Sequence, residues 1–149
     1  MTQEEKDIKY MRVALDEARK AGEMDEVPIG AVVVSQRGMI IGRGHNLTEG
    51  LKDITAHAEM QAITAAANTL GGKYLKDCTL YVTVEPCTMC AGAIGWSQLS
   101  RIVYGASDDK RGYTTVVSRS PFHPRATVTD GVLADECAAL VRDFFARKR

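Results

Sequence analysis

Residues 79–90 read TLYVTVEPCTMC, and this stretch decides the fold. Its first half, Thr79 to Val84, is rich in β-branched and aromatic residues, which is typical of a strand. Pro86 suits the opening of a helix, because proline lacks the N–H group that the first helical turn leaves unpaired. We therefore expect a strand that leads directly into a helix over about residues 87–97.

The flanking sequence continues this alternation of strands and helices. Its apolar patterns and turn residues predict helices over about residues 5–21, 56–70 and from about 133, a hairpin of strands over 29–34 and 39–42, and strands over 101–104 and 127–129. We expect Asp53 or Thr55 to cap the helix over 56–70 and Gly71-Gly72 to end it. Residues 106–125 show no clear periodicity. Because strands separated by helices pair in parallel, we expect an α/β fold, a three-layer α/β/α sandwich with a mixed sheet of about five strands.

Length and charge narrow the class of protein. The 149 residues are the size of one domain, which we place over residues 1–149. Basic and acidic residues balance at 19 each, which argues against a protein that coats nucleic acid by bulk charge but leaves room for a local basic patch. No apolar run approaches the roughly 20 residues of a membrane span. The polar N-terminus lacks a secretory signal, so we expect a cytoplasmic protein with no membrane partner.

Three side chains are candidates for a metal centre. Cys87 and Cys90 are three positions apart, so they share one face of a helix whose N-terminus favours the thiolate form. His57, at the start of the preceding helix, can point at the same spot. Two thiolates and one imidazole suit zinc, and three protein ligands leave the fourth tetrahedral position to water, as in catalytic sites. Glu59 stands two residues from His57 and is placed to exchange protons with that water.

Each half of this pattern is ambiguous alone. A lone histidine at a helix start is more often a cap or core residue, and a lone C-x-x-C also occurs in redox motifs and in structural zinc sites. Of the residues that remain for a fourth ligand, His45, His123, Cys78 and Cys137, none has zinc-finger spacing. We expect the two cysteines among them to be buried packing residues. The two halves together are far more specific than either.

The combination resembles a known family. His57-Ala58-Glu59 followed by Pro86-Cys87-Thr88-Met89-Cys90 is the signature of the cytidine deaminase superfamily, whose glutamate is an acid–base group and not a metal ligand. The stretches VPIGAV at 27–32, LYVTVEPC at 80–87 and GVLADECAAL at 131–140 are similar to the bacterial tRNA adenosine deaminases, and the similarity covers essentially the whole chain. It implies a homodimer that binds a tRNA anticodon loop and converts the wobble adenosine to inosine.

The resemblance also implies roles for individual residues. His57, Cys87 and Cys90 would hold zinc, and Glu59 would carry protons to the base. Asn46 would hydrogen-bond the flipped base, the backbone amides at Ala58 and Glu59 would face it, and Asp108 would lie near the sugar. Without the family, Asn46 reads as a turn residue and Asp108 as a solvated loop acid. The chain departs from the family at residues 112–116, which read GYTTV in place of Gly-Ala-x-Gly-Ser.

Three other functions fit parts of the sequence. Zero net charge and the altered loop favour a deaminase of a free base or nucleoside, such as guanine or cytosine, but the agreement of motifs over the full chain favours tRNA more strongly. A catalytically silent zinc scaffold subunit would be expected to lack Glu59, which is present here. A redox C-x-x-C protein would need a thioredoxin-like context, which the sequence does not show.

Overall fold

A five-stranded sheet lies at the centre of the computed structural model, which describes residues 1–149. Along the chain the elements are α1 (Gln3–Glu23), β1 (Gly30–Val34), β2 (Ile40–His45), α2 (Ala58–Leu70), β3 (Thr79–Val84), α3 (Thr88–Trp96), β4 (Arg101–Ala106), the 3-10 helix η1 (Tyr113–Thr115), β5 (Thr127–Thr129) and α4 (Ala134–Arg147). The strand order is β2-β1-β3-β4-β5. No helix combines the length and apolar character that a bilayer span requires.

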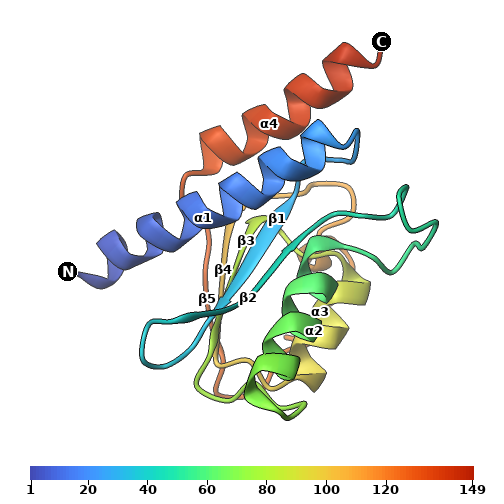
Figure 1. The fold of residues 1–149 in the computed structure, drawn as a ribbon. Helices are drawn as coiled ribbons and strands as arrows, with labels where there is room; N and C mark the ends of the chain where they lie inside the picture. Colours follow the sequence, from blue (N-terminus) through green and yellow to red (C-terminus); the bar gives the residue numbers. More distant parts are fainter.

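The pairing of the strands confirms the predicted mixed sheet. Strand β1 runs antiparallel to both β2 and β3, whereas β3, β4 and β5 are parallel to one another. Helices α1 and α4 lie side by side on one face, and α2 and α3 cover the other (Figure 1). The predicted α/β/α sandwich is therefore confirmed.

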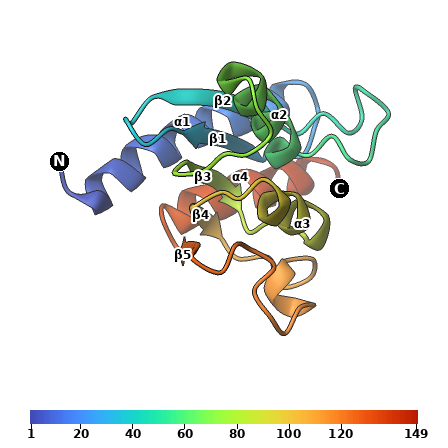
Figure 2. The same cartoon turned by 90° about the horizontal axis from the view of Figure 1, so that it is seen from below.

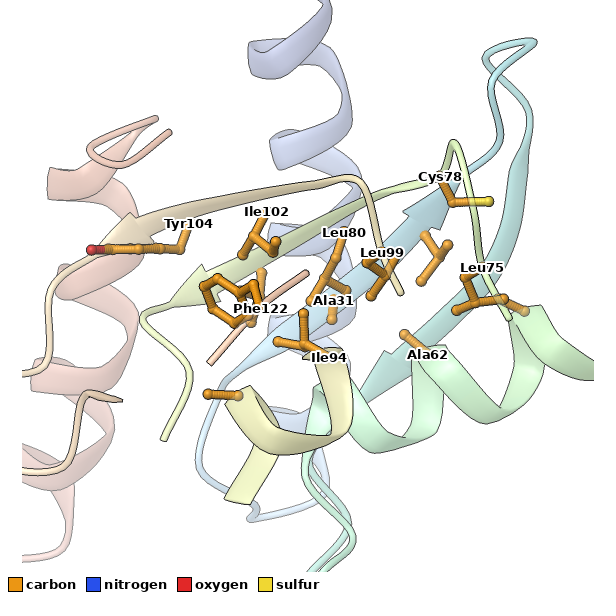
Figure 3. Close-up of a cluster of buried hydrophobic side chains, with 14 of the residues drawn as sticks. Ala31, Ala62, Leu75, Cys78, Leu80, Ile94, Leu99, Ile102, Tyr104 and Phe122 are labelled. Carbon is orange, nitrogen blue, oxygen red and sulfur yellow. The ribbon is translucent and has the colours of Figure 1, made fainter. Parts of the chain in front are cut away.

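Side chains of the central strands alternate between two cores. In β3, Leu80 and Val82 point toward α2 and α3, whereas Tyr81 points toward α1. Figure 3 shows Leu80 and Ile102 of the sheet facing Ile94 of α3. Each of these three side chains is fully buried, which contributes roughly 1.5–3 kcal/mol. Burial on both faces explains why β3 reads as an almost unbroken apolar run.

The helix boundaries differ from the prediction in two places. Helix α1 starts at Gln3, because Thr2 and Glu5 form a reciprocal capping box with hydrogen bonds of 2.9 and 3.1 Å. The predicted cap of α2 at Asp53 or Thr55 is wrong. Helix α2 starts at Ala58, and the Asp53 carboxylate instead accepts hydrogen bonds from the backbone and hydroxyl of Thr55. Asp53 therefore forms a local Asx turn with Thr55 and does not cap the helix.

Strand β2 is longer than predicted and packs tightly on α2. A Cβ atom on Gly44 would overlap the carbonyl oxygen of Ala58, so only glycine lets the end of the strand come so close to the start of the helix. This contact places Asn46, which directly follows β2, beside the N-terminus of α2. The long loop that separates these two elements extends away from the sheet (Figure 1).

Candidate metal centre

The site is built at the N-termini of α2 and α3. His57 is the N-cap residue of α2, and Cys87 is the N-cap residue of α3. Neither side chain makes a capping hydrogen bond to its own helix, so both remain available to a ligand. Cys90 lies in the first turn of α3, three positions after Cys87.

The three side chains converge in the structure. His57 Nδ1 lies 3.7 Å from Cys87 Sγ and 3.5 Å from Cys90 Sγ, and all three donor atoms lie within 4.8 Å of one another. An ion bonded tetrahedrally at roughly 2.3 Å to sulfur and 2.0–2.1 Å to nitrogen would separate nitrogen from sulfur by about 3.6 Å. The donor set and its spacing therefore fit zinc.

Hydrogen bonds between these three side chains shift their pKa values. The hydrogen bond from the Cys90 thiol, and a second from His57, lower the pKa of Cys87 to about 3 against the effect of burial. The same contact raises the pKa of Cys90, which keeps the shared proton. The hydrogen bond to Cys87 raises the pKa of His57. A bound metal ion would replace these protons, because its ligands bind as thiolates and neutral imidazole.

Glu59 lies beside the three donor atoms on the first turn of α2. The side chain is buried, with 4% of the residue exposed. Burial raises the pKa of Glu59 to about 7, although a backbone N–H group partly opposes the change. A carboxyl group that titrates near neutral pH can both accept and release a proton.

A cavity of about 740 Å³ opens above the cluster. Asn46, Ala58, Glu59 and Asp108 all line it, together with His57 and Cys87. Asn46 is buried, and its Oδ1 atom has no hydrogen-bond partner in the protein. An unsatisfied buried amide oxygen costs stability, and such groups need an explanation such as a ligand.

A loop after β4 forms one wall of this cavity. It contributes Asp108, Lys110, Arg111 and Val116. The Asp108 carboxylate accepts hydrogen bonds of 3.0 Å from the backbone N–H groups of both Lys110 and Arg111. Asp108 therefore shapes its own loop in addition to lining the cavity.

The remaining histidines and cysteines lie outside the cluster. His45 bonds to Glu17 of α1, and the His123 ring accepts from the Arg125 backbone. Cys78 and Cys137 are buried, and burial raises the pKa of both thiols, as expected of packing residues.

Sequence reasoning missed Glu85, between β3 and the cysteines. Its buried carboxylate accepts three hydrogen bonds from the cavity-wall loop, at Asp108 and Thr114. No spacing rule signals such a contact, because the loop partners lie 23 and 29 residues downstream.

Comparison with known proteins gives consistent matches. Residues 4–106 match the family model of the cytidine and deoxycytidylate deaminase zinc-binding region. The chain is 46% identical to a tRNA-specific adenosine deaminase of Agrobacterium fabrum, over 94% of each chain. It is 45% identical to a tRNA-specific adenosine deaminase of Bacillus subtilis, over 100% of this chain and 92% of the relative.

Solved structures agree with these relatives. One comes from work on A-to-I editing by tRNA:A34 deaminases at the wobble position of transfer RNA. It matches with a TM-score of 0.82 and 45% identity, over 89% of this chain and 98% of the other. A guanine deaminase from Nitrosomonas europaea matches with a TM-score of 0.79 and 29% identity, over 93% of this chain and 84% of the other. The fold is thus shared by deaminases of different substrates.

Proposed function

The chain belongs to the cytidine and deoxycytidylate deaminase zinc-binding family, and from this premise we propose that it hydrolyses adenosine to inosine at the wobble position of tRNA. The observation that carries the proposal is the convergence of His57, Cys87 and Cys90 beside buried Glu59, at the floor of a cavity. The relatives of about 45% identity favour RNA adenosine as the substrate.

In the proposed reaction, water replaces the amino group at C6 of adenine, and ammonia leaves. Zinc held by His57, Cys87 and Cys90 would supply Lewis-acid activation, which lowers the pKa of water to about 7. Glu59 accepts a proton from the water and delivers it to N1 of the base. It then transfers the second proton of the water to the departing amine, so that protons balance and the carboxyl group returns to its starting state.

Three further residues would position the base. The free Oδ1 atom of Asn46 accepts a hydrogen bond from the base. The first N–H group of α2, at Ala58, has no acceptor within the helix, and both Ala58 and Glu59 line the cavity. Asp108 lies at the cavity wall, where the sugar of a flipped nucleotide would pass. A base must leave its stack to reach this floor, which suits an unpaired anticodon loop.

We propose a homodimer that assembles through α3. This helix carries no charged residue, and its outer side includes the exposed Trp96, with 85% of the residue accessible. A Cβ atom on the neighbouring Gly92 would meet nothing, so the helix surface is open there. Exposed apolar patches of this kind mark interfaces, and a second copy would cover it with the same uncharged face.

We also propose that residues 1–149 act as one cytoplasmic domain. Both cores share the central sheet, which supports one folding unit. All four cysteines are free, as expected of a protein in a reducing compartment.

One experiment separates the proposed substrate from its alternative. We would incubate the zinc-loaded protein with an anticodon stem-loop that carries a wobble adenosine and, separately, with guanine, cytosine and their nucleosides. We expect inosine in the RNA and no ammonia from the free compounds. Guanine is the strongest alternative because a guanine deaminase shares the fold. Ammonia from a free base alone would overturn the RNA assignment, and no turnover by the zinc-loaded protein would favour a silent scaffold.

A further inference from the structure

The buried carboxylate of Glu85 joins two parts of the site that are distant in the sequence. Glu85 follows β3 and precedes the cysteines of α3, and only 5% of the residue is exposed. Its Oε1 atom accepts a 3.1 Å hydrogen bond from the Asp108 backbone. Its Oε2 atom accepts from the backbone and hydroxyl groups of Thr114, at 3.0 and 2.7 Å. One side chain therefore holds both ends of the loop of residues 108–114.

This loop has little regular structure of its own. Only the short helix η1 interrupts the stretch between β4 and β5. In Figure 2 this stretch projects from the body of the protein beyond α3. Besides Glu85, residues 108–114 are attached to the body by a backbone hydrogen bond of 2.9 Å from Tyr113 to Pro86, by a bridge between Cys87 and Gly112, and by the packing of Tyr113 against Tyr104 of β4. A charge-assisted anchor is the strongest kind of hydrogen bond available at such a place.

The local sequence leaves room for this carboxylate. A Cβ atom on Gly112 would overlap the Glu85 carboxyl group, so the backbone approaches it only because residue 112 is glycine. Thr114 supplies a hydroxyl donor in addition to its N–H group. Both residues belong to the GYTTV stretch, in which Gly112 keeps the first glycine of the family pattern and Thr114 occupies its variable third position. The anchor therefore uses positions at which the chain does not depart from that pattern.

We propose that Glu85 is a positioning residue that fixes the loop of residues 108–114 as a wall of the cavity and thereby sets the affinity for substrate. The exposed outer part of the loop presents Lys110 and Arg111 to the cavity. These two cations can meet phosphates of an RNA only if the loop is held in place. Glu85 takes no part in metal binding, since it lies outside the group formed by His57, Cys87 and Cys90. The effect on affinity rests on the proposed RNA substrate, whereas the anchoring itself does not.

Two substitutions test the anchoring role of Glu85 while they leave the metal ligands in place. In Glu85→Gln the amide nitrogen must face one of the backbone donors, because a glutamine side chain has only one acceptor oxygen. Thr114→Val keeps the shape and the backbone N–H group but removes the 2.7 Å hydroxyl contact. Thr69→Val is the matched control, because the Thr69 hydroxyl bonds only within its own helix, to Ala65.

The first readouts do not depend on activity. Zinc content should stay at that of the wild type in all variants. Amide hydrogen exchange of peptides covering residues 106–118 should be about tenfold faster in Glu85→Gln, which loses a hydrogen bond to a charged group, and less so in Thr114→Val. Unchanged exchange in Glu85→Gln, or loss of zinc, would overturn the proposal, because Glu85 would then not hold the loop or would act through the metal.

Kinetics on the anticodon stem-loop give the second readout. We expect KM to rise about tenfold in Glu85→Gln and a few-fold in Thr114→Val, with kcat within about twofold of the wild type, as for a loss of uniform binding. The Thr69→Val control should match the wild type. A fall in kcat with unchanged KM would assign Glu85 to the chemical step instead. If wild-type protein fails to act on the stem-loop, the proposed substrate is wrong, and the exchange experiment still decides whether Glu85 anchors the loop.

Discussion

The Arg101 guanidinium donates two parallel hydrogen bonds of 2.6 and 2.7 Å to the Asp7 carboxylate, although the residues lie 94 positions apart. Asp7 belongs to α1 and Arg101 opens β4, so the pair fastens the helix to the sheet. Tyr81 donates a third hydrogen bond to Asp7, and Arg101 also bonds to Thr129 of β5. The pair is mostly buried, with side-chain exposures of 19% for Arg101 and 6% for Asp7.

Arg101→Ala should therefore strongly destabilise the protein. Removing one partner of a buried pair leaves the other charge without compensation, so we expect the free energy of unfolding to fall by about 3 kcal/mol. Urea denaturation followed by circular dichroism measures it. Arg19→Ala is the control, because the Arg19–Asp16 pair is exposed and worth less than about 0.5 kcal/mol. Equal effects of the two substitutions would show that the Arg101 pair contributes nothing special.

The same pair predicts a pH dependence of stability. Burial alone would raise the pKa of Asp7, but hydrogen bonds from Arg101, Tyr81 and Gln3 outweigh it and hold the pKa below the ordinary 3.8. A lowered folded-state pKa stabilises the protein above pH 3.8 and loses this effect as pH falls through the folded value. The stability gap between wild type and Asp7→Asn should thus be constant near neutral pH and shrink in acid. Denaturation curves across the acid range check this, and a gap that widens in acid would contradict it.

The sequence predicts those parts of the fold that depend on local pattern. Residues 79–84 and 127–129 were expected as strands and form β3 and β5. The predicted helix cap at Asp53 or Thr55 is wrong because these two residues hydrogen-bond to each other, and residue type alone does not show which partner a side chain will bond. The capping box of Thr2 and Glu5 carried a readable T-x-x-E signal and was missed.

In the site, too, local sequence pattern predicts some arrangements and not others. His57, Cys87 and Cys90 stand at two helix starts, so motif and spacing suffice to predict that they meet. The hydrogen bonds that Glu85 accepts depend on the path of an irregular loop. The pairing of Asp7 with Arg101 likewise depends on how α1 lies across the sheet. Sequence periodicity carries no information on either arrangement.

Glu59 and the metal ligands give separable predictions. The purified protein should contain about one zinc per chain, as three converging ligands imply. Glu59→Ala should keep this zinc and lower kcat by at least about a hundredfold, because a positioned acid–base group supplies roughly 10²–10⁴ in rate. Cys87→Ser should instead lose zinc. Elemental analysis and turnover measured on the same samples check both, and a Glu59→Ala protein that remained active would remove this carboxyl group from the mechanism.

Trp96→Glu tests the proposed dimer. Because the proposed interface is symmetric, it would bury two carboxylates, one from each copy, on the uncharged outer face of α3. The loss of their hydration should make the variant dissociate. Light scattering after size-exclusion chromatography should report about twice 16.2 kDa for the wild type and 16.2 kDa for the variant. Met39→Glu is the control, since Met39 is 65% exposed in the turn between β1 and β2. A wild type that elutes as a monomer would refute the dimer.

Asn46→Ala should separate stability from function. The Oδ1 atom of Asn46 is buried without a partner, so its removal relieves a cost of roughly 1–3 kcal/mol and the free energy of unfolding should stay level or rise. The same change removes the acceptor proposed to orient the base, so kcat/KM on the stem-loop should fall at least about tenfold. Asn68→Ala on the exposed surface of α2 is the matched control and should leave kcat/KM unchanged. If Asn46→Ala instead destabilised the protein and kept full activity, Asn46 would be a structural turn residue, as its position after β2 suggests without the cavity.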